Sequence, residues 1–113
     1  MVTIYHNPRC SKSRAGLQYL SNKNIEYQVI EYLKNPLTAQ NIRDIAEKTK
    51  LSPYELVRTQ ENYYKTALKG KTFTDQEWCE IIAKNPELLK RPIVTKANLG
   101  IFAQPPQNMD ALL

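Results

Sequence analysis

The chain has 113 residues, a length typical of one domain, and 42% of them are hydrophobic, which is enough for one buried core. No apolar run approaches the roughly 20 residues that a membrane-spanning helix requires. The first residues lack the basic and apolar regions of a signal peptide. We therefore expect a single domain over residues 1–113 in the cytoplasm, with no membrane partner.

Two cysteines, Cys10 and Cys79, are too few for a disulfide-rich secreted protein. With His6 as the only histidine they are also too few for a typical zinc site, so we expect no metal and no bound cofactor. The formal net charge is +5, but most basic residues are scattered or alternate with acids, which argues against a nucleic-acid partner. Basic residues crowd only around Cys10, and this favours a small anionic ligand.

The predicted elements begin with a strand at residues 2–5, a helix over residues 11–22 and a second strand around residues 27–29. This order predicts parallel strands joined by a right-handed crossover. Three helix starts follow, at Thr38 and at the capping boxes of Ser52 and Thr74.

Phe73 and Trp78 flank the last of these caps with the spacing of a hydrophobic staple. Residues 93–95 and 100–103 then predict a hairpin with a four-residue loop, and residues 107–113 predict a last helical turn or two. The element order predicts a small α/β domain.

Cys10 lies directly after the first strand and at the start of the first helix. A sulfur there faces unpaired N–H groups and the positive end of the helix dipole. Positive charge on Arg9, Lys12, Arg14 and His6 would further favour the nucleophilic thiolate over the thiol. Because the same N–H groups can bind an oxyanion, the segment predicts a reactive cysteine beside an anion site.

The residues after Cys10 restrict the mechanism. Ser13 makes the motif C-x-x-S, which excludes an internal Cys-x-x-Cys cycle, so an external thiol or a distant cysteine must release the product. Gly16 stands where the loop of a cysteine phosphatase needs arginine. Cys10 could instead be a small buried hydrophobe, but its polar neighbours argue against that. Cys79, inside a helix beside Trp78, is expected to be structural.

An ordered set of segments carries a family resemblance that covers nearly the whole chain. The active-site loop of the arsenate reductases that use glutathione and glutaredoxin is similar to Tyr5-His6-Asn7-Pro8 with Cys10, Ser13 and Arg14. The resemblance continues through Glu31-Tyr32-Leu33, Leu56-Val57-Arg58, Phe73-Thr74-Asp75 and Arg91-Pro92-Ile93-Val94. It implies a thioredoxin-like fold: a small mixed four-stranded sheet with a helical insertion between the βαβ unit and the C-terminal hairpin.

The resemblance also implies a reaction. Cys10 would attack the arsenic of arsenate, and glutathione as co-substrate, with glutaredoxin, would resolve the adduct. His6 would help to keep Cys10 ionised, and Arg58 and Arg91 would bind the oxyanion through the paired hydrogen bonds of guanidinium. Pro92 would be the cis proline that faces the cysteine. The other expected substrate-binding residues are Ser11, Lys12, Ser13, Arg14 and Gln104.

Three of these residues also have simpler interpretations. His6 could cap local backbone groups, and Arg58 could be a surface charge that is favourable at the end of a short helix. Arg91 could stabilise the loop before the hairpin. Gln104 departs from the family pattern, which has a third arginine there. Loss of one charge-assisted contact of about 1.5–3 kcal/mol would weaken oxyanion binding roughly ten- to a hundredfold.

Two other functions remain open beside arsenate reduction. One is a related thiol oxidoreductase that acts on another oxidised thiol or oxyanion. The other is a regulator of the Spx kind, which shares the fold and binds RNA polymerase. Such regulators often carry a Cys-x-x-Cys switch, so Ser13 favours the enzyme, as does Arg58.

Overall fold

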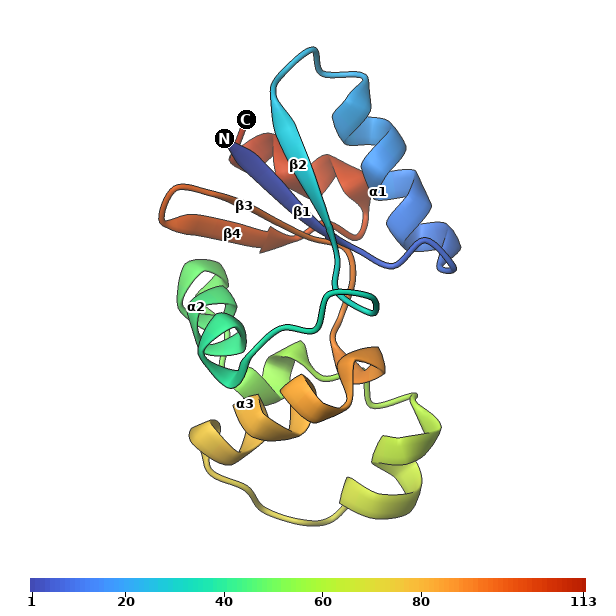
Figure 1. Cartoon of the computed structure of the whole chain (residues 1–113), viewed down its shortest axis with the longest axis vertical. Coiled ribbons are helices and arrows are strands. Elements are labelled where there is room, and N and C mark those ends of the chain that lie inside the picture. The colour runs from blue at the N-terminus through green and yellow to red at the C-terminus, as the bar shows by residue number, and fades with distance from the viewer. The chain divides into compact units, whose positions relative to one another are not determined.

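Four strands form one mixed sheet in the order β2-β1-β3-β4 in the computed structural model, which describes residues 1–113. The chain divides into two units: Met1–Asn35 with Arg91–Leu113 contains the sheet, and Pro36–Lys90 is helical (Figure 1). The fold expected from the resemblance, with a helical insertion between the βαβ unit and the hairpin, is therefore confirmed.

The βαβ unit consists of β1 (Val2–His6), α1 (Ser11–Ser21) and β2 (Tyr27–Glu31). β1 and β2 are parallel, with Val2 opposite Tyr27 and His6 opposite Glu31. The predicted parallel pairing is thus confirmed. The C-terminal end of β1 leads directly into the loop that carries Cys10.

The hairpin consists of β3 (Ile93–Lys96) and β4 (Leu99–Phe102), and β3 is antiparallel to β1. Its turn is tighter than the four-residue loop expected from the sequence, because Lys96 already pairs with Leu99. Ala97 makes this possible by adopting a positive φ of 53°, a conformation that two-residue hairpin turns demand.

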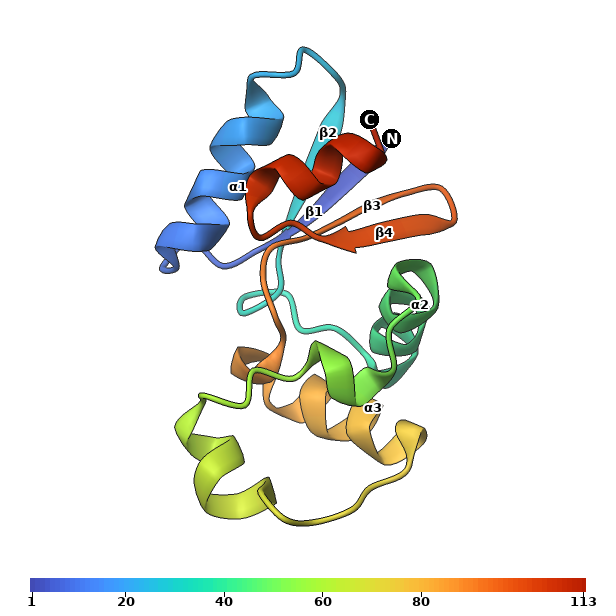
Figure 2. The ribbon, with the colours of Figure 1, turned by 180° about the vertical axis from the view of Figure 1, so that it is seen from behind.

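One face of the sheet is covered by α1 and by the C-terminal 3-10 helix η4 (Pro106–Ala111), as Figure 2 shows. The phenolic OH of Tyr19 on α1 donates to both carboxylate oxygens of Asp110, each at 2.8 Å, and so fastens η4 to α1. The core beneath them contains Val2, Ile4, Leu20, Val94, Ala103 and Met109.

The insertion contains two longer helices, α2 (Ala39–Thr49) and α3 (Asp75–Lys84). Both begin with capping boxes: the one at Thr74 was predicted from the sequence, and at Thr38, where the sequence predicted a cap, the side chain of Asn41 completes the box. The rings of Phe73 and Trp78 meet edge to face with centroids 4.9 Å apart, which confirms the hydrophobic staple.

Three short helical turns complete the insertion. The capping box at Ser52 starts only η1 (Pro53–Leu56), a single 3-10 turn. The π-helical turn η2 (Tyr64–Leu68) and the 3-10 turn η3 (Pro86–Leu88) were not predicted, because segments this short carry no usable hydrophobic period. No helix of the chain has both the length and the apolar character needed to cross a membrane.

Candidate active site

Cys10 occupies the N-cap position of α1, where its backbone is extended (φ −97°, ψ 124°). Its carbonyl oxygen accepts the N–H of Arg14 at 2.9 Å, while its side chain makes no capping hydrogen bond. The residue is half-buried, and the first turn of α1 contains no acidic side chain. The sulfur therefore lies at the positive end of the helix without a neighbouring carboxylate in that turn.

Asn7 organises the loop between β1 and α1. Its carbonyl oxygen accepts the N–H of Cys10 at 3.1 Å, and its side-chain Oδ1 accepts the N–H of Arg9 at 3.0 Å. Its own N–H donates to the hydroxyl of Ser13 at 3.0 Å. The loop is thus folded back onto the first turn of α1, and the backbone of Cys10 is fixed through Asn7.

His6 and Ser13 form a buried pair behind this loop. Nδ1 of His6 lies 2.7 Å from Oγ of Ser13, and the two residues are 4% and 0% exposed. Burial lowers the pKa of His6 from its ordinary value of 6.5, with a smaller contribution from Arg14, while Glu31 and Ser13 oppose the shift. The lowered pKa favours the neutral imidazole, which does not add the positive charge that the sequence suggested for His6.

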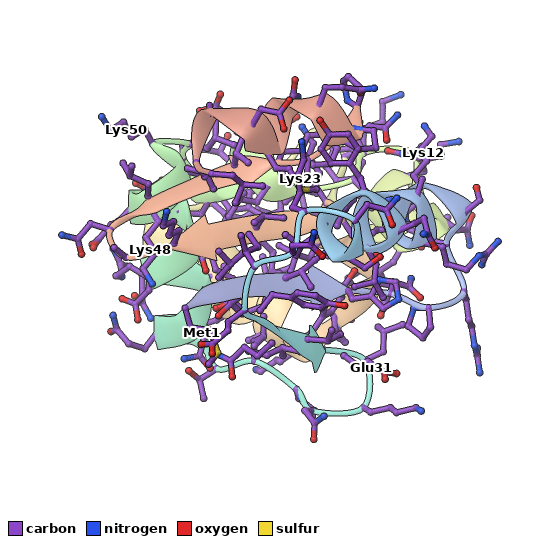
Figure 3. All side chains as sticks on the ribbon, turned by 90° about the horizontal axis from the view of Figure 1, so that it is seen from above. Met1, Lys12, Lys23, Glu31, Lys48 and Lys50 are labelled. Carbon is purple, nitrogen blue, oxygen red and sulfur yellow. The ribbon has the colours of Figure 1, made fainter.

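The expected cationic surroundings of Cys10 are present on the protein surface. Arg9, Lys12 and Arg14 are all exposed, and Lys12 extends outward near the start of α1 (Figure 3). Arg14 donates through a terminal guanidinium nitrogen to the carbonyl oxygen of Pro8 at 3.0 Å, which draws its charge back over the loop. Ser11 is exposed at the first helical position, whereas Ser13 is completely buried.

Arg91 lies just before β3 and is half-buried. Its Nε atom is buried and has no hydrogen-bond partner within the chain. Buried N–H groups are nearly always paired, so an unpaired one calls for a ligand or another explanation. A bound oxyanion would supply the missing acceptor.

Pro92 connects this arginine to α1. The peptide bond between Arg91 and Pro92 is cis, as the resemblance implied. The ring of Pro92 packs so tightly on Gly16 that a Cβ atom there would lie 2.6 Å from Cγ of the proline. Gly16 is one turn beyond Ser13 on the buried side of α1, and Cys10 lies one turn before Ser13. The Arg91–Pro92 segment therefore packs against the helix that begins at Cys10.

Gln104 is brought to the same segment by the hairpin. The N–H of Ala103 donates to the carbonyl oxygen of Pro92 at 2.9 Å, which extends the pairing of Ile93 with Phe102 by one residue. Arg91 and Gln104 each lie one residue beyond this hydrogen bond, and the peptide bonds to Pro92 and Pro105 that follow them are both cis. The position at which the family pattern has a third arginine is thus next in the chain to a residue that is bonded to the Arg91–Pro92 segment.

Arg58 belongs to the helical insertion. One of its terminal nitrogens forms an ion pair with Glu61 and also donates to the carbonyl oxygen of Glu87 at 3.4 Å. Its backbone N–H donates to Leu88 at 2.7 Å, beside the bridge between Val57 and Leu89. The guanidinium group is therefore already paired within the insertion, and its expected role at the oxyanion stays a prediction.

Cys79 lies on α3 with 0% exposure, and burial raises the pKa of its thiol. Its structural role, predicted from the helix pattern, is confirmed.

Sequence reasoning missed two residues of the site, Asn7 and Gly16. The Asn-Pro pair after a strand and a glycine inside a helix were the available signals.

Comparisons with known proteins identify the family of this chain. The model of the ArsC family matches residues 5–103. The chain belongs to the ArsC family. This ArsC-family protein is 35% identical to an arsenate reductase of Neisseria meningitidis over 114 residues, which cover 99% of this chain and 97% of that protein. It is also 36% identical to the uncharacterized protein YfgD of Escherichia coli over 110 residues, or 96% and 92% of the two chains.

Among solved structures, an arsenate reductase from Vibrio cholerae superposes with a TM-score of 0.94 at 32% identity, covering 99% of this chain and 97% of that one. This similarity confirms the thioredoxin-like fold of the ArsC-family protein. It is thus a member of the arsenate reductase family and resembles a thiol oxidoreductase.

Proposed function

We propose that this protein reduces arsenate to arsenite, with Cys10 as the nucleophile and with glutathione and glutaredoxin as the source of electrons. The observation that carries the proposal is the placement of Cys10, half-exposed at the N-cap of α1 with no capping bond to its side chain. A thiolate is the attacking form of cysteine, and a helix N-terminus favours negative charge on the sulfur and on a bound oxyanion.

Arg91 supports an oxyanion as the substrate. Its buried, unpaired Nε can donate to one oxygen while a terminal nitrogen donates to a second, the paired geometry in which guanidinium binds such anions. Arg58 would be the second arginine. For it to bind the oxyanion, its ion pair with Glu61 must be exchanged for arsenate.

The proposed reaction is balanced with two thiols. The Cys10 thiolate forms a sulfur–arsenic bond as one arsenate oxygen leaves as water, and glutathione then binds the arsenic through its sulfur as a second oxygen leaves as water. Because Ser13 replaces a resolving cysteine, a thiol of glutaredoxin attacks the glutathione sulfur: a disulfide forms between them, and the electron pair of the broken sulfur–arsenic bond reduces As(V) to As(III). Water then cleaves the remaining Cys10–arsenic bond, which releases arsenite and restores the Cys10 thiol. We also propose that the reaction takes place in the cytoplasm, because free thiols persist in reducing compartments.

A coupled assay tests the proposal. Arsenate-dependent oxidation of NADPH is followed with glutathione, glutaredoxin and glutathione reductase, and omission of each thiol component tests the electron source. Wild-type protein should turn over, and Cys10→Ser should not. Cys79→Ala is the matched control, because that thiol is buried in α3, and its turnover should match the wild type. Absence of arsenate-dependent turnover in the wild type would refute the proposal.

Gln104 favours a second candidate, a thiol oxidoreductase whose substrate carries less negative charge than arsenate. A neutral amide at position 104 provides one cation fewer than the family pattern. The discriminating experiment offers a glutathionylated peptide in the same assay. Cys10-dependent reduction of the peptide without arsenate turnover would select this second function.

A further inference from the structure

The buried hydroxyl of Ser13 has a definite set of partners. A serine hydroxyl has one proton to donate and two lone pairs that accept. One lone pair accepts the N–H of Asn7 at 3.0 Å. The hydroxyl proton then needs an acceptor, because a buried donor left unpaired is costly. Nδ1 of His6, at 2.7 Å, is the acceptor that the chain provides.

This pairing fixes the state of the imidazole. If Ser13 donates to Nδ1, that nitrogen carries no proton, and the ring proton of neutral His6 lies on Nε2. The burial of His6, which is 4% exposed, favours the same neutral form. Imidazole, hydroxyl and the Asn7 amide thus form a continuous chain of hydrogen bonds.

This series of hydrogen bonds ends at Cys10, the proposed reactive residue. The N–H of Asn7 donates to the hydroxyl of Ser13, and the carbonyl oxygen of Asn7 accepts the N–H of Cys10 at 3.1 Å. Ser13 is completely buried, so it does not meet solvent from which a substrate would approach. A role in holding Asn7 fits this environment better than the direct substrate contact expected from the sequence.

We propose that Ser13 is a positioning residue of the reactive centre: its hydroxyl joins the neutral imidazole of His6 to the main chain of Asn7 and thereby fixes the loop that holds Cys10. The inference rests on the proposed function only in taking Cys10 as the reacting group. At the position where a C-x-x-C protein has its second thiol, this chain has the hydroxyl of Ser13, which fixes the geometry of the Cys10 loop.

The first test is the rate at which iodoacetamide alkylates Cys10, a reaction that requires no arsenate. Ser13→Ala removes the link, and misplacement of a reacting group by an ångström can cost up to about a hundredfold, so we expect a loss of roughly tenfold or more. Ser21→Ala is the matched control. Its hydroxyl lies on the same helix and donates to the carbonyl of Gln18 at 2.8 Å, and its removal should leave the rate unchanged.

A second pair of variants separates positioning from charge. His6→Asn keeps an acceptor near the place of Nδ1 but cannot become a cation, and it should retain most of the alkylation rate. His6→Ala should lose the rate as Ser13→Ala does. Loss of the rate in both His6 variants, with Ser13→Ala unaffected, would overturn the proposal in favour of a charged histidine.

The third test needs no variant and is independent of folding defects. His6 is the only histidine, so nitrogen-15 NMR of the imidazole gives one unambiguous set of signals. At neutral pH we expect an unprotonated Nδ1 and a protonated Nε2. A protonated Nδ1 would overturn the proposal. Because neither alkylation nor NMR involves arsenate, failure of this inference is distinguishable from failure of arsenate reduction.

Discussion

Gly16 and Pro92 touch at a distance that only a hydrogen atom on Gly16 allows, since a Cβ atom there would lie 2.6 Å from Cγ of the proline. The contact joins the helix that begins at Cys10 to the segment that carries Arg91. It therefore ties the helix of the proposed nucleophile to the segment of the expected oxyanion ligand, two groups far apart in the sequence.

Gly16→Ala should destabilise the protein. Helix propensity alone would favour alanine by about 0.5–1 kcal/mol, whereas overpacking costs about 1–3 kcal/mol, so the net loss of unfolding free energy should be about 1–2 kcal/mol. Urea denaturation measures it. In a Pro92→Ala background the offending Cγ is absent and the nearest contact relaxes to the 3.5 Å of Cβ, so the substitution should become neutral or stabilising. Equal effects in both backgrounds would contradict the steric explanation.

Arg91→Lys should impair arsenate binding although the positive charge is kept. Lysine lacks the fork that uses Nε and a terminal nitrogen together, so the KM for arsenate should rise roughly tenfold with a smaller change in kcat. Steady-state kinetics in the coupled assay measure both constants. Arg43→Lys makes the same chemical change in the insertion, where the arginine is bonded to Gln76, and should leave both constants as they are.

Gln104→Arg should have the opposite effect. Its neighbour Ala103 is bonded to Pro92, the neighbour of Arg91, so a guanidinium at position 104 should add a charge-assisted contact to the oxyanion and lower the KM for arsenate by about tenfold or more. Gln107→Arg, on the exposed surface of η4, adds the same charge and serves as the control. Equal effects of the two variants would indicate general electrostatic attraction instead of a specific site.

The free energy of unfolding should decrease as the pH is lowered, because His6 is buried in the folded protein. Its folded-state pKa lies below the ordinary 6.5, so on lowering the pH the unfolded chain takes up a proton first. The stabilisation is therefore complete above about pH 6.5 and is lost as the pH falls toward the folded-state pKa. Urea denaturation between about pH 7.5 and pH 5.5 should show the decline. His6→Gln should be flat in this range, since no other histidine is present. A wild-type profile as flat as that of the variant would argue against the neutral imidazole.

The elements of the fold could be predicted from the sequence because their signals are local. A capping box lies within four residues, as at Thr74, and the strand–helix–strand order needs only periodicity. The same local logic located Cys10 at the N-cap of α1. It failed for η2, which is too short to have a period. It also failed for the turn at Ala97, where the positive φ of this residue allows a loop two residues shorter than expected.

The sequence by itself thus determined which residue is proposed as the nucleophile, and that Ser13 has no thiol with which to resolve an adduct on it. Only the tertiary structure decided that His6 is buried, which favours the neutral imidazole, and that Ser13 is turned inward. It also brought Pro92 to Gly16. The reason is physical: burial, register and close packing depend on partners distant in the chain, and a charge or a hydroxyl acquires its role from those partners.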